Sequence, residues 1–353
     1  MSSEFRSGVR RVSLGTARAL LLASLLAVPL TALAGRAYVS NEDGRSVSVI
    51  DTDAGRVIAT IPVGKRPRGI KVSRDGRRLY VAVSGLPKCP PTTPDAECAK
   101  LKHDLSADGI AVVDTRRLKL LKVLNGGSDP EQFDLGRSGR ELYISNEDVG
   151  TLSVLDIARA TVLTRIPVGH EPEGVRVSPN GDWVAVTSET DNMISIIDTH
   201  LLQLHATVKV GERPRDLAYT RDGRTAYVTN EVDASVYRIR IPSGAPAEKF
   251  IQLRPTDRPM GIVLDRTGQR MYVSTGRGGT IAVIALHGPR GPRLITEVPV
   301  GARPWGIALT PNDRFLFTAN GSSNDVSVVD TLTLRVVKKI PVGKSPWGVV
   351  IGP

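Results

Sequence analysis

The sequence predicts an all-β protein, namely a seven-bladed β-propeller of four-stranded antiparallel blades. The prediction depends on repeated motifs, of which the clearest is Tyr-Val/Ile-Ser/Thr-Asn. Its copies, complete or degraded, begin at Tyr38, Tyr80, Tyr143, Ala185, Tyr227, Tyr272 and Phe317. The steps between these positions are 42, 63, 42, 42, 45 and 45 residues. A nearly constant period of this length is typical of repeat architectures, and the one long step marks an insertion.

Two further motifs keep the same period. A strand-ending Asp, usually followed by Thr, recurs at Asp51, Asp114, Asp156, Asp198 and Asp330. The motif Pro-Val-Gly-x-x-Pro-x-Gly is complete at residues 62–69 and recurs along the chain. Its second proline is present in every repeat, at Pro67, Pro130, Pro172, Pro214, Pro259, Pro304 and Pro346. Because three motifs share one period, chance is an implausible explanation.

Residues 167–210 show how one repeat is expected to fold. Apolar and polar residues alternate over residues 175–178, which predicts a short strand. Asn180-Gly181 predicts a tight turn, because both residue types readily adopt positive φ angles. The second, third and fourth strands are expected at residues 183–188, 193–198 and 207–210. Four short antiparallel strands in one such unit are typical of a propeller blade.

The two ends of the repeat array predict how the ring closes. Tyr38 begins a second strand of a blade, whereas residues 347–351 match only a first strand. We therefore expect the C-terminal strand to complete the N-terminal blade, which leaves no open sheet edge. A solenoid is the alternative architecture, but the mismatched ends favour a ring. Val and Ile dominate the strands, so the blades are expected to pack through β-branched side chains.

Residues 1–34 are expected to be a signal peptide, and residues 35–353 a single propeller domain. Four arginines precede an apolar run at residues 20–33, and Ala32-Leu33-Ala34 offers a small-x-small cleavage site. The run is too short for a comfortable membrane span, so no span is expected after cleavage. These features predict a periplasmic protein. The general and the twin-arginine export routes both stay open, and an anchor helix is the less favoured alternative.

An insertion at residues 85–108 accounts for the long step between repeats. It contains four prolines and the two cysteines of the chain, Cys89 and Cys98. In an oxidising compartment the simplest interpretation is a disulfide that staples this loop. The alternative is a metal site formed by Cys89, Cys98 and His103. It lacks a fourth ligand and a Cys-x-x-Cys pair, so no metal site is expected.

The charge pattern excludes one class of partner. The formal net charge is +11, and the basic residues are spread through turns and loops. No basic run with interleaved aromatic residues occurs, as a nucleic-acid groove would require. We therefore expect a solvated basic protein that binds no nucleic acid. A closed ring is also expected to be stable as a monomer.

The residue after each second proline is expected near the mouth of the central channel. Around the ring these residues are Arg68, Glu131, Glu173, Arg215, Met260, Trp305 and Trp347. The loops between second and third strands open on the same face and carry Glu42, Glu147, Glu189 and Glu231. His170 lies in one Pro-motif loop and is expected to reach the same mouth. Because these residues differ in type from repeat to repeat, this face of the ring is a candidate for binding a ligand or a partner.

Two interpretations of this face compete. In the first, the arginines pair with carboxylates and the tryptophans stack, which makes a pocket for a small anionic or planar ligand. In the second, Arg–Glu pairs tie neighbouring blades together and the tryptophans plug the channel. The second is favoured at this stage, because ion pairs commonly serve structure alone.

The motifs also resemble those of a known family. Tyr227-Val228-Thr229-Asn230 and the Pro-Val-Gly-x-x-Pro-x-Gly motif resemble YVTN-family β-propeller repeats over residues 38–351. The signal segment, seven repeats and Cys-bearing insert are most similar to exported propellers associated with pyrroloquinoline quinone (PQQ)-dependent alcohol catabolism. The resemblance implies an accessory protein whose periplasmic partner is a quinoprotein dehydrogenase, a cytochrome or a substrate-binding protein. It implies no known reaction and no cofactor, although contact with PQQ stays open.

The sequence departs from the repeat at a few positions. The strand-ending Asp is missing at residues 237–239 and 283–285, and Gln132 and Asp216 replace the motif glycine. These blades are expected to be locally irregular.

Signals for an enzyme are few. The chain contains no Gly-x-Ser-x-Gly elbow, metal-type histidine spacing, haem attachment motif or phosphate-binding glycine loop. The preferred hypothesis is therefore a non-catalytic binding or accessory protein. The alternative is a lactonase-like or cofactor-holding enzyme that uses Glu131, Glu173, His170 and Arg215 on the axial face.

Overall fold

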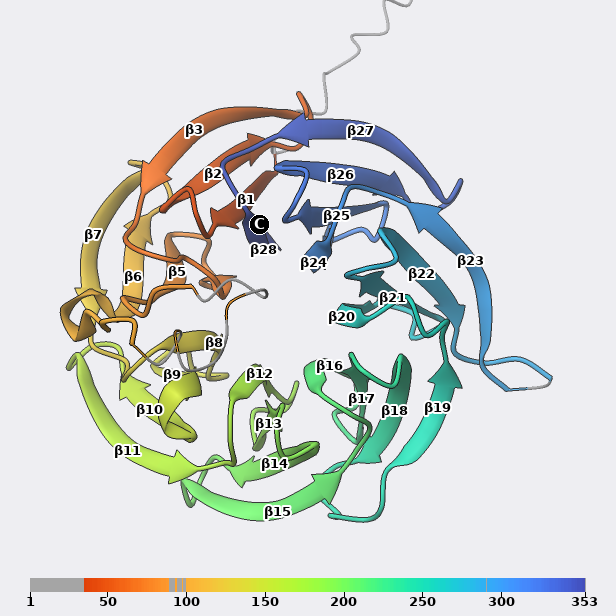
Figure 1. Ribbon diagram of the computed structural model, residues 1–353, viewed down its shortest axis with the longest axis horizontal. Helices are drawn as coiled ribbons and strands as arrows, with labels where there is room; N and C mark the ends of the chain where they lie inside the picture. Colours follow the sequence, from red (N-terminus) through yellow and green to blue (C-terminus); the bar gives the residue numbers. More distant parts are fainter. Residues whose placement is uncertain (1–34, 89–92, 94–96, 98–99, 290, 353) are drawn as a thin grey trace, which may run out of the picture. The chain divides into compact units, whose positions relative to one another are not determined.

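The computed structural model describes residues 35–88, 93, 97, 100–289 and 291–352. These residues form seven four-stranded antiparallel sheets that are arranged as blades around a central axis (Figure 1). The ring lies within one compact unit that begins at Ala34. The predicted seven-bladed propeller is thus confirmed. The expected signal peptide lies outside the described residues, as do Cys89 and Cys98 of the expected disulfide.

The C-terminal strand completes the first blade, as the sequence predicts. Blade 1 has the strand order β28-β1-β2-β3, and its strands are β28 (Pro346–Ile351), β1 (Arg36–Asn41), β2 (Ser46–Asp51) and β3 (Arg56–Pro62). Tyr38 pairs with Val350 in the antiparallel ladder that closes the ring. The first and last strands of the chain are thus paired in one blade, which closes the ring.

In each of the other blades, the four strands follow in chain order from the axis outward (Figure 1). Blades 2 to 4 contain β4 (Ile70–Val72), β5 (Arg78–Val83), β6 (Gly109–Asp114), β7 (Lys119–Leu124), β8 (Pro130–Leu135), β9 (Glu141–Asn146), β10 (Thr151–Asp156), β11 (Thr161–Pro167), β12 (Pro172–Val177), β13 (Trp183–Ser188), β14 (Met193–Asp198) and β15 (Gln203–Lys209). Blades 5 to 7 contain β16 (Pro214–Tyr219), β17 (Thr225–Asn230), β18 (Ser235–Arg240), β19 (Glu248–Gln252), β20 (Pro259–Leu264), β21 (Arg270–Thr275), β22 (Thr280–Ala285), β23 (Arg293–Pro299), β24 (Pro304–Leu309), β25 (Phe315–Asn320), β26 (Asp325–Asp330) and β27 (Arg335–Pro341). Two short 3-10 helices are η1 (Leu105–Ala107) and η2 (Glu147–Val149).

In blade 4, the second and third strands, β13 and β14, lie where the sequence predicts them. The first strand begins three residues earlier than expected, at Pro172, and the fourth begins four residues earlier, at Gln203. The fourth strand is the outermost and is largely exposed, so few buried residues mark its start. Outer strands therefore carry a weaker apolar pattern than inner ones.

The strand-ending Asp recurs because its side chain caps the turn that follows. The Oδ1 atom of Asp51 accepts hydrogen bonds from the backbone N–H groups of Asp53 and Ala54, at 3.0 and 2.8 Å. Asp198 caps its turn in the same way. Such side-chain bonds satisfy turn donors and fix the connection between the third and fourth strands. Blade 5 lacks this Asp and has the shortest outer strand, the five-residue β19, whereas blade 6 keeps a seven-residue β23.

In five of the seven blades, the hydroxyl at the third position of the Tyr-Val-Ser/Thr-Asn motif donates a hydrogen bond to the next blade, whereas Ala82 and Ala319 occupy this position in blades 2 and 7. The Oγ atom of Ser40 donates to the carbonyl oxygen of Arg68 in blade 2, at 2.6 Å. Ser274 donates in the same way to the carbonyl oxygen of Trp305 in the next blade, at 2.6 Å. These bonds hold the backbone beside the axis, and with it the side chain that follows each motif proline.

Most motif glycines are required by the same close approach. A Cβ atom at Gly174 would lie 2.5 Å from the carbonyl oxygen of Arg215, and one at Gly261 would lie 2.6 Å from that of Trp305. The glycines therefore allow neighbouring inner strands to meet near the axis.

The hydrophobic core is divided among the seven interfaces between neighbouring blades. Between blades 1 and 2, Tyr38 packs with Val49, Ile70 and Val81. Val and Ile predominate as expected, and the motif aromatic adds one large ring to most interfaces. In the described part of the chain, no helix is both long and apolar enough to cross a membrane.

Candidate functional site

A β-bulge directs one side chain of most blades toward the axis. In β12, Pro172 pairs with Ser188 and Val175 pairs with Val186, so the inner strand has one extra residue between them. The same shift follows the motif proline in blades 1, 3, 5, 6 and 7. Bulges of this kind re-aim side chains. The residue after each motif proline is called the axial position below.

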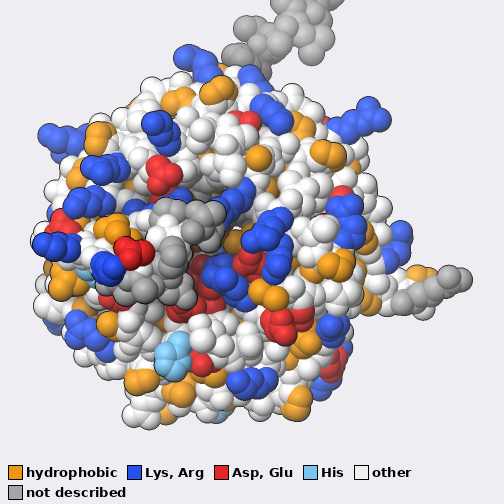
Figure 2. All heavy atoms as spheres, in the orientation of Figure 1, with side chains coloured by type: hydrophobic (Ala, Val, Ile, Leu, Met, Phe, Trp, Pro, Cys, Tyr) orange, Lys and Arg blue, Asp and Glu red, His pale blue; other side chains and the backbone are white. Residues whose placement is uncertain are grey.

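The axial positions help to form a cavity of about 620 Å³, here called the axial cavity. It is lined by Glu42, Asp43, Arg66, Arg68, Lys88, Glu131, Glu147, Glu173, Glu189, Arg213, Arg215, Arg303, Trp305, Gly321, Ser322, Asn324, Lys344, Ser345, Pro346 and Trp347. Figure 2 shows acidic and basic side chains side by side near the centre of this face of the ring. The charged residues come mainly from blades 2 to 5, and both tryptophans come from blades 7 and 1.

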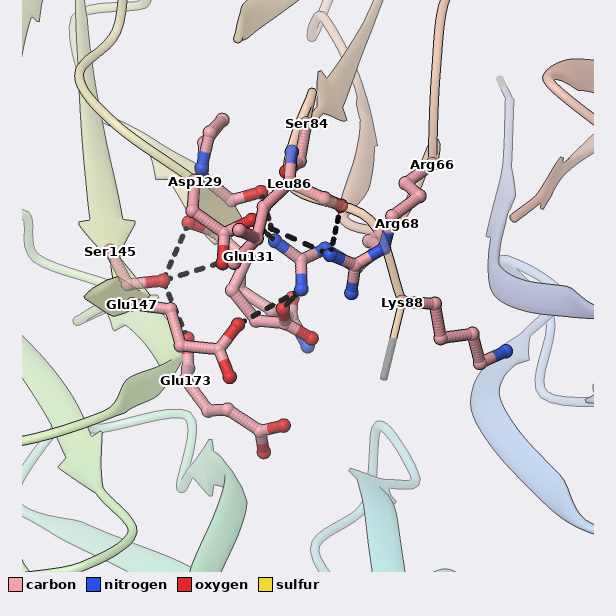
Figure 3. Close-up of polar contacts among 12 residues, drawn as sticks. Arg66, Arg68, Ser84, Leu86, Lys88, Asp129, Glu131, Ser145, Glu147 and Glu173 are labelled. Atoms are coloured by element: carbon pink, nitrogen blue, oxygen red, sulfur yellow. Dashed lines mark hydrogen bonds and ion pairs between the residues drawn. The ribbon is translucent and has the colours of Figure 1, made fainter. Parts of the chain in front are cut away.

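Arg68 is the centre of the first charged cluster (Figure 3). Its Nη2 atom lies 2.5 Å from Oδ1 of Asp129 and donates to the carbonyl oxygen of Pro130 at 3.0 Å. Its Nη1 atom lies 2.9 Å from Oε2 of Glu147 and also forms an ion pair with Glu131. Arg68, Asp129 and Glu131 are almost fully buried. The cluster joins blade 2 to blade 3.

Arg215 is the centre of the second charged cluster. Its Nε atom donates to Oε2 of Glu231 at 2.7 Å, and its Nη1 atom pairs with both Glu173 and Glu189. Arg213 lies beside it and is 2.5 Å from Oε2 of Glu189. One buried guanidinium thus compensates carboxylates from blades 4 and 5. The expectation that Arg–Glu pairs connect neighbouring blades agrees with this geometry.

Burial shifts the ionisation of several of these groups. Burial raises the pKa of Glu147 to about 7, although the charge of Arg68 opposes the shift. Burial likewise raises the pKa of Glu173, against the charge of Arg215. Burial alone would lower the pKa of Arg68, but the charges of Asp129 and Glu147 outweigh it and raise that pKa. The arginine therefore stays charged, while Glu147 can exchange a proton near neutral pH.

Two tryptophans form the opposite wall of the axial cavity. The ring centroids of Trp305 and Trp347 lie 5.3 Å apart, and the ring planes are tilted by 40°. The guanidinium carbon of Arg303 lies 5.3 Å from the centroid of Trp305. Trp347 is buried, whereas Trp305 is partly exposed. An aromatic surface with a cation beside it is suited to a ring ligand that carries negative charge.

The cations of this wall differ from those of the charged clusters. Among the described residues, Arg303 and Lys344 have no acidic partner within ion-pair distance. Both are exposed and line the axial cavity. The hydroxyl and amide groups of Ser322 and Asn324 lie on the same wall. This wall, made of Trp305, Trp347, Arg303, Lys344, Ser322 and Asn324, is called the tryptophan wall below.

The described ends of the insertion border the axial cavity. Arg66 donates from Nη1 to the carbonyl oxygen of Leu86 at 2.6 Å, and Lys88 lies 2.8 Å from Oε2 of Glu42. The Nε2 atom of His103 lies 2.8 Å from Oδ2 of Asp108. Its partner in the described structure is thus a carboxylate, and the cysteines of the alternative metal site lie outside the described residues. Among the described residues, no three acidic, histidine or cysteine side chains are arranged to hold a metal ion.

The structure brings together six of the eight candidate residues proposed from the sequence. Arg68, Glu131, Glu173, Arg215, Trp305 and Trp347 all line the axial cavity. Met260 occupies the equivalent position but is buried and is not part of the lining, and its carbonyl oxygen accepts a hydrogen bond from Thr229 at 2.6 Å. His170 is exposed and faces Asp191, with Nδ1 3.1 Å from Oδ1, rather than the cavity.

Sequence reasoning missed a second ring of cavity residues. The residue before each motif proline adopts a positive φ angle in every repeat, between 40° and 58°. These residues are Arg66, Asp129, Glu171, Arg213, Arg258, Arg303 and Ser345. Four of them line the axial cavity. The signal was available, because arginine occupies this position in four repeats. A positive φ at a non-glycine residue is uncommon and is often found near functional sites.

Comparisons with known proteins support the fold and suggest a class. Residues 198–343 match the family model described as "Lactonase, 7-bladed beta-propeller". A putative 6-phosphogluconolactonase of Bacteroides fragilis has a TM-score of 0.72 at 18% identity, over 92% of this chain and 100% of that chain. A periplasmic gluconolactonase of Pseudomonas aeruginosa has a TM-score of 0.70 at 19% identity, over 90% of this chain and 99% of that chain.

A protein of a different kind is similar to a comparable degree. Hydrazine synthase of Kuenenia stuttgartiensis has a TM-score of 0.70 at 20% identity, over 83% of this chain and 91% of that chain. Such low identities show the fold alone. No curated protein matches this chain at a significant level. The chain is thus similar in fold to lactonase propellers.

Proposed function

We propose that the protein binds a small sugar acid, or the lactone that such an acid forms, in the axial cavity. We propose further that it opens the lactone by hydrolysis. The observation that carries the proposal is the tryptophan wall, where Arg303 and Lys344 have no acidic partner among the described residues. Aromatic faces cover the apolar face of a ring, and guanidinium groups bind carboxylates with directed hydrogen bonds.

The charged clusters complement this wall. Carboxylates held by buried arginines accept hydrogen bonds from the hydroxyl groups of a sugar. Binding then requires no further loss of side-chain entropy from these carboxylates, because the ion pairs already order them. Glu173 and Glu189 are held in this way by Arg215. The partial match to the lactonase family model, which includes Arg303 and Trp305, supports the same class.

Glu147 is the residue best placed to act as a general base. Its side chain is 29% exposed, whereas those of Glu42, Glu131, Glu173 and Glu189 are 3–7% exposed. Its pKa, raised to about 7 by burial against the charge of Arg68, is close to the value that favours proton transfer at neutral pH.

The proposed reaction is transfer of the acyl group to water. Glu147 accepts a proton as water attacks the lactone carbonyl carbon, and a cation of the tryptophan wall stabilises the developing oxyanion. The bond between the carbonyl carbon and the ring oxygen then breaks. The proton returns to that oxygen, so the product carries one carboxyl and one hydroxyl group.

Two measurements test this proposal. Purified protein is titrated calorimetrically with gluconate, and the hydrolysis of glucono-1,5-lactone is followed against its spontaneous rate. We expect one binding site per chain, and we expect Glu147→Gln to lower kcat by roughly a hundredfold or more while gluconate still binds. Absence of binding overturns the proposal, and a normal kcat in Glu147→Gln removes Glu147 from the mechanism.

A second candidate is the accessory role in PQQ-dependent alcohol oxidation. PQQ is a planar tricarboxylate, so the tilted tryptophans and the exposed cations of the tryptophan wall suit its shape and charge as well. We propose that such a protein is exported and that its partner is a periplasmic dehydrogenase, cytochrome or substrate-binding protein. Tryptophan fluorescence titrated with PQQ, and a pull-down from periplasmic extract, test this role. Saturable quenching that Trp305→Ala removes supports it, whereas unchanged fluorescence and recovery of free protein alone contradict it.

A further inference from the structure

A second cavity lies along the inner strands, beyond the axial positions. It has a volume of about 470 Å³ and is called the distal cavity here. Its lining includes the polar residues Lys71, Gln132, Arg176, Asp216 and Tyr219. The rest of the lining is largely apolar and includes Ile262, Leu264, Ile307, Leu309, Val349 and Ile351. Trp347 lines both the axial and the distal cavity.

The two walls of the distal cavity come from different blades. The residue four positions after the motif proline is Lys71, Asp134 and Arg176 in blades 2 to 4. In blades 5, 6, 7 and 1 the equivalent residues are Ala218, Val263, Ala308 and Val350. All except Asp134 line the cavity. One side of the channel is therefore charged, whereas the opposite side is apolar.

The two departures from the motif glycine lie in this cavity. Gln132 and Asp216 replace that glycine in blades 3 and 5, and both belong to the lining. Arg176, between them in chain order, lies 2.7 Å from Oδ2 of Asp216 and 3.5 Å from Oε1 of Gln132. These two substitutions therefore add hydrogen-bonding groups to the polar wall where the other repeats have no side chain.

The polar wall offers hydrogen-bond donors to a ligand. Asp134 accepts from the backbone N–H of Val177 at 3.0 Å and lies 3.1 Å from Nζ of Lys71. Asp134 is thus satisfied by donors from two residues. Lys71, in contrast, has only this one carboxylate partner within ion-pair distance among the described residues. The buried hydroxyl of Tyr219 has no hydrogen-bond partner among the described residues. A buried polar group without a partner is costly, and a ligand with acceptor oxygens would satisfy it.

The ionisation of the polar wall points the same way. Burial and the charge of Arg176 lower the pKa of Lys71, although Asp134 opposes the shift. Burial also raises the pKa of Asp216, although Arg176 opposes it. Both shifts show that the wall is poorly solvated, and the negative charge of a carboxylate beside Lys71 would raise the pKa of that lysine toward its ordinary value.

We propose that the distal cavity binds an amphipathic monocarboxylate with a chain of medium length. Its carboxylate accepts hydrogen bonds from Lys71 and Tyr219, and its hydrocarbon part lies against Val263, Ala308 and Leu309. The site is separate from the one proposed for sugar acids, so either proposal can fail alone. Burial of the methylene groups against this apolar side supplies the hydrophobic contribution to binding.

The test is a calorimetric titration of the purified protein with octanoate, 1-octanol and octyltrimethylammonium. We expect one octanoate per chain and affinity for octanoate at least about tenfold higher than for the other two probes. Ala308→Phe fills the apolar side without changing a charge, and we expect it to weaken octanoate at least about tenfold. Val337→Phe, at an exposed position of β27, is the matched control and should leave affinity unchanged.

Lys71→Met separates the charged from the apolar contribution. We expect it to lower the affinity for octanoate by about tenfold and to leave that for 1-octanol unchanged. Thermal melts show which variants remain folded. Either folded variant, Ala308→Phe or Lys71→Met, is enough to test the proposal. The proposal is overturned if octanoate does not bind, if the cationic probe binds equally well, or if folded Ala308→Phe or Lys71→Met binds octanoate as the parent does.

Discussion

The guanidinium carbon of Arg215 lies 5.7 Å from the ring centroid of Trp305, so one side chain connects the charged clusters with the tryptophan wall. On its other side Arg215 pairs with Glu173, Glu189 and Glu231. It thereby holds carboxylates of blades 4 and 5 while it borders an aromatic residue of blade 7. The two interpretations that compete at the level of sequence are therefore compatible, because the same arginine connects blades and shapes the axial cavity.

Removing Arg215 should destabilise the ring. In Arg215→Met, the buried carboxylates of Glu173 and Glu189 lose their shared cation, which typically costs about 3–5 kcal/mol. Urea denaturation near neutral pH measures this change. Arg213→Met is the matched control, because Arg213 is about half exposed and should matter far less. Equal stabilities of the two variants would show that the buried cluster contributes little.

Glu147 should make stability depend on pH. Its pKa is about 7 in the folded protein and about 4.5 when the side chain is solvated, so the folded state binds more protons between these values. The free energy of unfolding therefore falls as pH rises through this window. The full shift corresponds to roughly 3 kcal/mol, which Glu147→Gln should remove.

The control for this prediction is Glu248→Gln, since Glu248 lies on the outer strand β19, away from the axial cavity. Urea denaturation at several pH values compares the three proteins. Parallel pH profiles for the parent and Glu147→Gln would mean that Glu147 titrates at its ordinary pKa and is not suited to proton transfer at neutral pH.

The hydroxyl bonds between blades should each contribute modestly to stability. Ser274→Ala removes the 2.6 Å hydrogen bond to the carbonyl oxygen of Trp305 and should lower the free energy of unfolding by about 1 kcal/mol. Ser322→Ala, at an exposed position, should have no effect on stability. A loss below a few tenths of a kcal/mol in Ser274→Ala would show that the inter-blade bond is replaced by another interaction.

The fold could be predicted almost completely, because each blade repeats the same local chemistry. The motif tyrosine, the turn-capping Asp and the motif glycine each have one structural role that recurs. The outer strands were harder to place, since exposure weakens their apolar pattern, as at Gln203. Blade 5 also departs from the repeat where its capping Asp is missing, in agreement with the expected irregularity. Blade 6 lacks the same Asp but keeps a full outer strand.

The candidate site could be predicted only in part. The axial positions follow from the repeat, and six of the eight proposed residues line the axial cavity. Arg–Glu pairs between neighbouring blades follow from the sequence, but the individual partners could not be inferred, since they depend on side-chain reach across the channel. Arg68 and Glu147, for example, are 79 positions apart in sequence. Arg303 lies on the cavity through its positive φ angle, and the only sign of this in the sequence is the recurrence of arginine before the motif proline in four repeats.

Trp305 should matter more for ligand binding than for folding. Trp305→Ala removes an aromatic face that is partly exposed, so it should weaken gluconate by at least about tenfold with a smaller loss of stability than a core tryptophan would cause. Trp183→Ala is the matched control, because Trp183 stacks on His205 in blade 4, away from the axial cavity. Equal gluconate affinity in the two variants would separate the tryptophan wall from binding.

The most direct test of the account is a calorimetric titration of gluconate into the parent protein and into Arg303→Ala. Arg303 has no acidic partner among the described residues and is exposed, so the variant should fold normally and lose only the ligand contact. We expect one site in the parent and an affinity lower by at least about tenfold in Arg303→Ala. Absence of binding to the parent, or identical affinities of the two proteins, would contradict the central claim that the tryptophan wall holds a sugar acid.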